Sequence, residues 1–132
     1  MQSISPLDVA LPGVALKTAV LGALALVMIF ILVVFVESVV LQLIGWGNLR
    51  ESLRGAFWMN LASTAAGFLL LVAVNRLAVF GLILSWACSV LIEGLVLRRF
   101  WRQKKPSHWY AALSANLVSY LLLIVPAYLF RG

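Results

Sequence analysis

Residues 18–36 form an unbroken stretch of nineteen positions without a charged side chain. A helix needs about 20 residues to cross the roughly 30 Å hydrocarbon core of a bilayer, so this stretch predicts a membrane-spanning helix. Two more apolar blocks follow, at 55–97 and 110–130. The first of these is too long for one crossing and is interrupted at Asn75-Arg76, which predicts two helices joined by a tight turn.

The overall composition supports a membrane location. Hydrophobic residues make up 64% of the 132 positions and charged residues only 11%, whereas a soluble domain is about a quarter charged. We therefore expect an all-α integral membrane protein, with a single domain 1–132 and four transmembrane helices. The expected helices lie near 12–45, 49–74, 77–101 and 108–130. The single cysteine, Cys88, excludes an internal disulfide.

Local signals mark the ends of these helices. Pro12 suits the first turn of a helix, and Asn48 followed by Glu51 resembles a capping box at the start of the second helix. Pro126 removes a backbone donor, which predicts a kink or a weakening in the last turns of the fourth helix. The chain starts without the basic segment of a secretory signal peptide, so we expect no cleaved leader.

Basic residues gather beside two of the predicted loops. Arg50 and Arg54 follow the first helix. Five more lie at the end of the third helix and in the loop after it: Arg98, Arg99, Arg102, Lys104 and Lys105. Because cytoplasmic loops are enriched in Lys and Arg, we expect a multi-pass protein of the cell (inner) membrane, with loops 46–54 and 98–108 in the cytoplasm and both termini outside. The cluster of five is expected to contact lipid head groups or a partner protein.

Tryptophans lie close to the same loops. Trp46, Trp101 and Trp109 flank them, as the aromatic belt of a membrane protein does. Trp86 falls in the middle of the third helix, where we expect it to pack or to face lipid. A cofactor contact at Trp86 is the alternative interpretation.

The chain also matches itself at a spacing of 56 residues. Three polar pairs coincide: Glu37 with Glu93, Asn60 with Asn116, and Ser63 with Ser119. This spacing predicts two tandem helical hairpins, about 12–75 and about 76–132, as a parallel internal repeat. The apolar matches carry little information because Leu and Val are common throughout, but only four acidic residues exist and two of them are equivalent.

The paired glutamates and asparagines suggest a polar clamp. Within each hairpin the Glu and the Asn lie at similar distances from the loop, so each Glu is expected to reach the Asn across its own hairpin. Each Ser lies three residues after the Asn, on the same helix face. Interfacial placement is one alternative, because Glu93 precedes Arg98 by five residues. A site for a transported proton, cation or substrate is another, with a proton shared if Glu37 and Glu93 face one another. Catalysis is the third.

Small residues and missing motifs complete the interpretation. Ser63 and Gly67 have the spacing of closely approaching helices, as do Ala62 and Ala66. His108 is the only histidine, and we expect it to be solvated or interfacial. The sequence has no Cys/His cluster for a metal and no histidine pair for haem, so we expect no cofactor, no metal and no enzymatic activity. We expect no nucleic-acid partner.

The second half of the chain resembles a pattern in small polytopic membrane proteins of prokaryotes that have no assigned activity. There, a Glu-bearing helix precedes a helix that opens with an Ala-Asn-Leu-x-Ser segment. The similarity covers roughly 85–125 and rests on Glu93, Ala115, Asn116, Leu117 and Ser119. It implies a prokaryotic membrane location and supplies no activity. The chain is also similar to small multidrug exporters in size and in having a Glu-bearing helix, but its Glu comes late in the first helix.

These features favour one function and leave a second open. We expect a non-enzymatic integral membrane subunit, or a structural or assembly component, that packs in the lipid bilayer against other membrane subunits or against copies of itself. The alternative is a small proton-coupled transporter that uses Glu37 and Glu93. The two hypotheses differ in whether Glu37→Gln or Glu93→Gln abolishes a pH-dependent flux.

Overall fold

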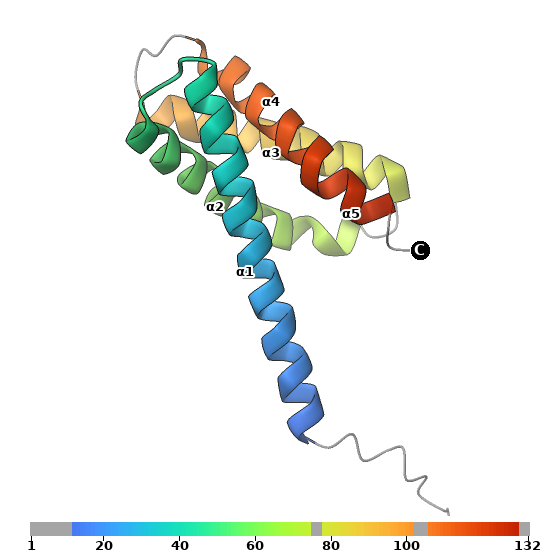
Figure 1. Cartoon of the computed structure of the whole chain (residues 1–132). Coiled ribbons are helices and arrows are strands. Elements are labelled where there is room, and N and C mark those ends of the chain that lie inside the picture. Colours follow the sequence, from blue (N-terminus) through green and yellow to red (C-terminus); the bar gives the residue numbers. More distant parts are fainter. Residues whose placement is uncertain (1–11, 75–77, 102–105, 130–132) are drawn as a thin grey trace, which may run out of the picture. The chain divides into compact units, whose positions relative to one another are not determined.

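The computed structural model describes residues 12–74, 78–101 and 106–129, and this part of the chain is all helices and short turns (Figure 1). The elements are α1 (Pro12–Leu43), α2 (Leu49–Val74), α3 (Ala78–Phe100), α4 (His108–Ser119), the π-helical segment η2 (Tyr120–Ile124) and α5 (Val125–Leu129). The last three follow one another without a break, so the described residues form an all-α, four-helix protein. Their bounds lie within two residues of those predicted from the apolar blocks.

The chain divides into two units, Met1–Ile31 and Leu32–Gly132. The described part of the first unit is the beginning of α1, where the side chains from Val14 to Ile29 are all exposed. Val14–Leu43 is long and apolar enough to cross a membrane, and within the described residues no other helix meets that test. A signal sequence near an N-terminus meets it equally well. Multiple membrane crossings therefore stay a prediction.

A short turn joins α1 to α2 and directs the chain back on itself. Gly45 has a φ of 74°, a conformation that residues with a Cβ adopt at a cost. The predicted capping box is confirmed: the Asn48 side chain accepts from the Glu51 backbone N–H at 2.9 Å, and the Glu51 carboxylate accepts from the Asn48 N–H at 3.3 Å. These two bonds satisfy free backbone donors at the start of α2.

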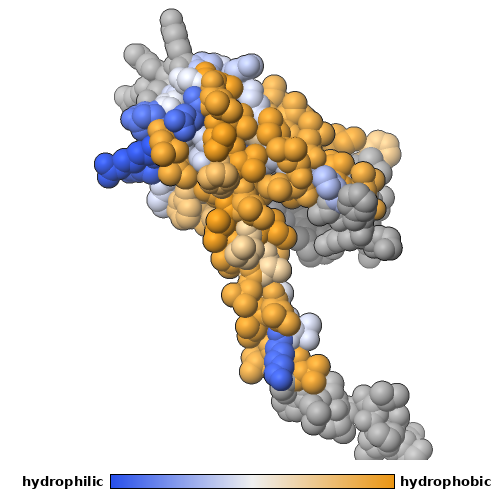
Figure 2. All heavy atoms as spheres, viewed as in Figure 1, coloured by the Kyte–Doolittle hydropathy of each residue, from blue (hydrophilic) through white to orange (hydrophobic). Residues whose placement is uncertain are grey.

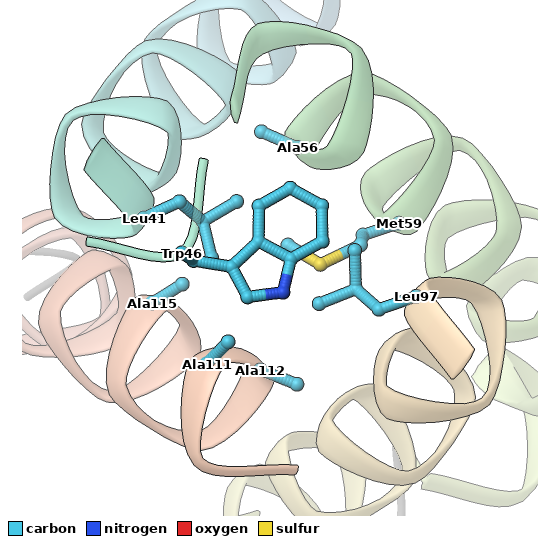
Figure 3. Packing of buried hydrophobic residues seen from close by; sticks show 8 residues of the cluster. All are labelled: Leu41, Trp46, Ala56, Met59, Leu97, Ala111, Ala112 and Ala115. Atoms are coloured by element: carbon cyan, nitrogen blue, oxygen red, sulfur yellow. The ribbon is translucent and has the colours of Figure 1, made fainter. Parts of the chain in front are cut away.

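Trp46, in this turn, lies at the centre of a buried apolar cluster of the second unit (Figure 3). Its side chain is only 1% exposed. Seven buried residues form the apolar cluster with it: Leu41, Ala56, Met59, Leu97, Ala111, Ala112 and Ala115. The prediction that Trp46 belongs to an aromatic belt is therefore wrong. Four of its neighbours are alanines, and such small side chains leave the space that an indole occupies in a close-packed interior.

Two glycines allow a tryptophan ring to lie close to a helix backbone in the second unit. A Cβ on Gly55 would lie 3.1 Å from the Trp46 ring, and one on Gly94 would overlap the Trp109 ring. At Gly67, in contrast, a Cβ would meet nothing within 4 Å among the described residues. The close helix approach that the Ser63–Gly67 spacing predicts is therefore not made at Gly67.

The fourth helix changes its hydrogen bonding just before Pro126. The Val125 N–H donates to the Tyr120 carbonyl, five residues back, which is the π-helical pattern. Proline lacks an N–H, and its ring clashes with the preceding turn of an α-helix. The wider π turn accommodates that ring, so the predicted interruption of the helix takes the form of η2.

The face of the second unit that Figure 2 shows is largely apolar. Hydrophilic residues gather near the start of α2, where Arg50 and Arg54 are exposed; Arg98 and Arg99 are also exposed, at the end of α3. Close to these arginines in the sequence, the exposed rings of Trp58 and Phe100 stack with centroids 6.2 Å apart. The charged residues and the exposed aromatic rings thus flank the ends of the helices that lead into the loops.

Candidate functional site

The predicted polar residues form one buried layer inside the second unit. Four helices contribute one residue each: Glu37 from α1, Asn60 from α2, Glu93 from α3 and Asn116 from α4. Asn60 is 6% exposed and the other three are 1% exposed. On each of these helices, the residue one turn nearer the loop belongs to the apolar cluster around Trp46. These residues are Leu41, Ala56, Leu97 and Ala112. The apolar cluster therefore covers this polar layer on the loop side.

Each glutamate accepts a hydrogen bond from the asparagine of its own hairpin. The Asn60 side-chain amide donates to Glu37 Oε2 at 2.6 Å, and the Asn116 amide donates to Glu93 Oε2. Both pairs are separated by 23 residues. The predicted contact across each hairpin is therefore confirmed, because residues equally far from the turn of an antiparallel pair lie at the same depth.

Each serine binds the glutamate of the other hairpin. Ser119 Oγ donates to Glu37 Oε1 at 2.7 Å, and the Ser63 side chain hydrogen-bonds to Glu93. Sequence spacing places each Ser on the face of its own Asn but does not say which helix lies opposite, so this crossing was not predicted. The serines tie the two hairpins to each other, whereas the asparagines close each hairpin.

The two serines have a second acceptor within reach. Ser119 Oγ lies 3.1 Å from the Asn116 carbonyl oxygen, and Ser63 Oγ lies 3.3 Å from the Asn60 carbonyl oxygen. A hydroxyl has one hydrogen to donate and can also accept. Each serine can therefore donate either to a glutamate or to the backbone of its own helix.

The asparagine amides have no such choice in the first hairpin. Asn60 Nδ2 donates to Glu37 and also to the Ala56 carbonyl, at 2.6 and 2.9 Å. Both of its hydrogens are in use, so this amide holds Glu37 in one orientation. Glu37 Oε1, in contrast, accepts from Ser119, whose hydroxyl can donate to the Asn116 carbonyl instead.

The glutamates contact polar neutral groups and no cation within the described residues. The partners of Glu37 are Asn60 and Ser119, and those of Glu93 are Asn116 and Ser63. Arg98 is exposed rather than turned to Glu93. Both carboxylates lie in the interior of the second unit, so neither is held by contact with an arginine. Their depth in a bilayer, and with it the interfacial alternative, stays a prediction.

The layer has the chemistry of a hydrogen-bonded clamp or of a proton site. Among the described residues no group of three or more His, Cys, Asp and Glu is placed to hold a metal ion. Neutral amide and hydroxyl donors stabilise a carboxylate without supplying a counter-charge. The arrangement can therefore fix the hairpins against one another and can hold a proton.

The predicted basic cluster is described only in part. Arg98 and Arg99 end α3 with exposed side chains. Arg102, Lys104 and Lys105 lie outside the described residues. Contact of this cluster with lipid head groups or a partner stays a prediction.

Several polar contacts were missed from the sequence. The Trp46 indole N–H donates to His108 Nδ1 at 3.2 Å, so His108 is partly buried instead of solvated. Ser85 Oγ and the Tyr120 hydroxyl lie 3.2 Å apart. The run of alanines at the start of α4 was the available signal that a large side chain fills the space beside it. Trp86 is partly buried, and its indole N–H has no acceptor among the described residues.

Comparisons with protein-family models, curated protein sequences and solved structures give no match to this chain. The resemblance to small prokaryotic membrane proteins therefore stays a prediction based on the residues quoted above.

Proposed function

We propose that this protein is a non-enzymatic, multi-pass membrane subunit in which two tandem hairpins are held together by a duplicated polar clamp. The observation that carries the proposal is the buried layer of Glu37, Asn60, Glu93 and Asn116, which joins four helices whose outer faces are apolar. A polar layer inside and apolar residues outside is the arrangement that suits helices packed in lipid.

The exposed apolar side chains support membrane insertion of all four helices. They include Phe35 on α1, Leu61 on α2, Leu91 on α3 and Leu121 on η2, exposed by 59, 42, 57 and 57%. A water-soluble protein rarely exposes a continuous apolar patch this extensive. In a bilayer the same side chains face lipid without cost.

The first part of α1 supports the presence of a partner. Side chains around its whole circumference from Val14 to Ile29 are apolar apart from Lys17 and Thr18, and all of them are exposed. A helix that is hydrophobic on every side is buried in a membrane or in a larger assembly. Other membrane subunits or a second copy of the chain would pack on such a helix.

The exposed arginines support the predicted orientation. Arg50, Arg54, Arg98 and Arg99 flank the connections that follow α1 and α3. With the positive-inside tendency, these arginines favour a cell (inner) membrane protein with both connections in the cytoplasm and both termini outside.

The native mass of the protein, extracted gently from its own membrane, tests the proposal. We expect one large complex of fixed stoichiometry, from which the chain does not dissociate on dilution. A chain that migrates alone or as a small homo-oligomer, with no other protein at constant ratio, would contradict the role of subunit.

A second candidate function is proton-coupled transport, and one observation favours it. Two carboxylates are buried in a single hydrogen-bonded network in which each touches residues of both hairpins. Purified protein in liposomes with an imposed pH gradient tests this function. Glu37→Gln and Glu93→Gln should abolish a flux that Glu51→Gln, a change at the exposed capping box, leaves intact. Equal flux in all three variants would exclude the transporter.

A further inference from the structure

We propose that Glu37 and Glu93 together hold a single proton at neutral pH, and that this proton sits on a carboxylate oxygen facing Ser119 or Ser63. The proposal concerns what the layer binds and holds equally for a subunit and for a transporter. It rests on the positions of the two carboxylates, on their neutral partners and on the second acceptors of the two serines.

The two carboxylates are close to each other. On α4, Asn116 binds Glu93 and Ser119 binds Glu37. Residues three apart on a helix have Cβ atoms about 5–6 Å apart, so one helix turn holds both carboxylates. On α2, Asn60 and Ser63 hold the same two carboxylates in the reverse order.

Among the described residues, no cation pairs with either glutamate. In the second unit α1 carries only Glu37 and α4 only His108, which accepts from Trp46. The charged residues of α2 and α3 lie toward the loops and are not paired with the glutamates: Arg50, Glu51, Arg54, Arg98 and Arg99. Two adjacent buried negative charges without a cation repel one another strongly, and one proton removes that repulsion.

The hydrogen bonds around Glu37 already fit a carboxylic acid. On Glu37, Oε2 accepts from Asn60, whose two amide hydrogens are both engaged. The proton therefore belongs on Oε1, where the acid O–H donates to Ser119 Oγ. The Ser119 hydrogen then turns to the Asn116 carbonyl, 3.1 Å away. No donor or acceptor is lost, and only hydrogen atoms move.

The same exchange is available on the other side. Ser63 binds Glu93 and lies 3.3 Å from the Asn60 carbonyl. A proton on Glu93 therefore has an asparagine and a serine as neighbours, as a proton on Glu37 has. Both residues have a serine able to accept from a carboxylic acid, so the proton can reside on either residue.

Infrared spectroscopy of the full-length protein in a bilayer tests this proposal. The readout is the carbonyl stretching band of a protonated carboxylic acid, which shifts on transfer to D₂O. The chain has only four acidic residues, so this band is assignable. Labelling glutamate with ¹³C at the side-chain carboxyl separates the glutamates from Asp8, and Glu51→Gln removes the glutamate of the capping box.

We expect a band equivalent to one carboxylic acid per chain at neutral pH, moved by the ¹³C label and unchanged in Glu51→Gln. Glu37→Gln and Glu93→Gln should each shift the frequency of the band, because the remaining carboxylic acid no longer has a carboxylate beside it. A band worth two acids, or one that neither substitution shifts, would mean that each residue is protonated independently of the other and would overturn the proposal. So would the absence of any band. The isotope-labelled wild type gives the number of protonated carboxylic acids per chain even where a variant does not fold.

Discussion

The side-chain amide of Asn60 has no spare hydrogen, because it donates to a carboxylate and to a carbonyl of its own helix at once. Such complete use of a polar group is what makes its burial tolerable. Ser63 and Ser119 differ from it in having a choice of acceptor. At the scale of single residues, the asparagines fix the positions of the carboxylates and the serines adapt to their charge.

Replacing either asparagine should destabilise the protein. In Asn60→Leu or Asn116→Leu a buried glutamate loses a donor, and leaving a buried polar group unsatisfied costs about 1–3 kcal/mol. Thermal unfolding in mild detergent measures the loss. Thr64→Leu, at an exposed position one turn along α2, serves as the control and should leave stability nearly unchanged. If both asparagine variants were as stable as the wild type, the clamp would not exist.

Adding one methyl group should separate the tight positions from the open ones. Gly94→Ala places a Cβ on the Trp109 ring, and Gly55→Ala places one 3.1 Å from the Trp46 ring. Overpacking typically costs about 1–3 kcal/mol, so both variants should unfold at a lower temperature. The matched change Gly67→Ala meets nothing within 4 Å and should be neutral or stabilising by up to about 1 kcal/mol. An equal change in unfolding temperature in all three variants would contradict this packing.

At the scale of elements, the turn between α1 and α2 does more than connect them. It carries Trp46 into the interior, where the indole packs in a cluster with residues of α1, α2, α3 and α4 (Figure 3) and donates to His108 at the start of α4. The turn therefore belongs to the core, and its backbone conformation sets where the indole lies.

The turn should be sensitive to the loss of glycine at one position. Gly45 has φ 74°, so Gly45→Ala should cost roughly 1–2 kcal/mol and should alter the environment of Trp46. Thermal unfolding and tryptophan fluorescence together report both effects. Gly22→Ala, within α1 and with nothing within 4 Å of the new Cβ, should leave both readouts as in the wild type. Unchanged fluorescence and stability in Gly45→Ala would show that the turn tolerates another conformation.

The bounds of the helices were easier to predict from the sequence than the contacts between helices. The capping box and the apolar blocks locate α2 at 49–74, as observed, because those signals are local in the sequence. The burial of Trp46 and the crossing from Ser119 to Glu37 depend on which helices lie side by side. Periodicity assigns a residue to a face and leaves the helix opposite that face unspecified. Pro126 likewise signals an interruption without specifying that a π turn forms.

At the scale of the whole molecule, the described residues combine an interior polar layer with an apolar exterior and an arginine-rich end (Figure 2). The repeat predicted the contact within each hairpin, because both members of each Glu–Asn pair recur at the same spacing. Composition indicated the apolar exterior but did not distinguish one membrane crossing from four. That distinction depends on the environment of the helices.

The number and direction of the crossings are open to a direct test. A reporter that is active only outside the cytoplasm distinguishes the topologies. If all four helices cross the membrane with their basic connections in the cytoplasm, this reporter should be active when fused after Gly132 and inactive when inserted at Ser107, between α3 and α4. Both reporters on the same side would contradict the four-helix topology, and an exchange of sides would reverse it.

The central position of Trp46 has a consequence for how such a chain could have arisen. Each half of the sequence supplies a Glu, an Asn and a Ser, so two identical separate hairpins would form the same four hydrogen bonds. They would not share the same apolar centre, because two indoles would then compete for the room that one fills (Figure 3). In this chain the position equivalent to Trp46, 56 residues later, is Arg102. A covalent fusion permits this inequality: one copy keeps the large aromatic residue, and the other is free to acquire a charge.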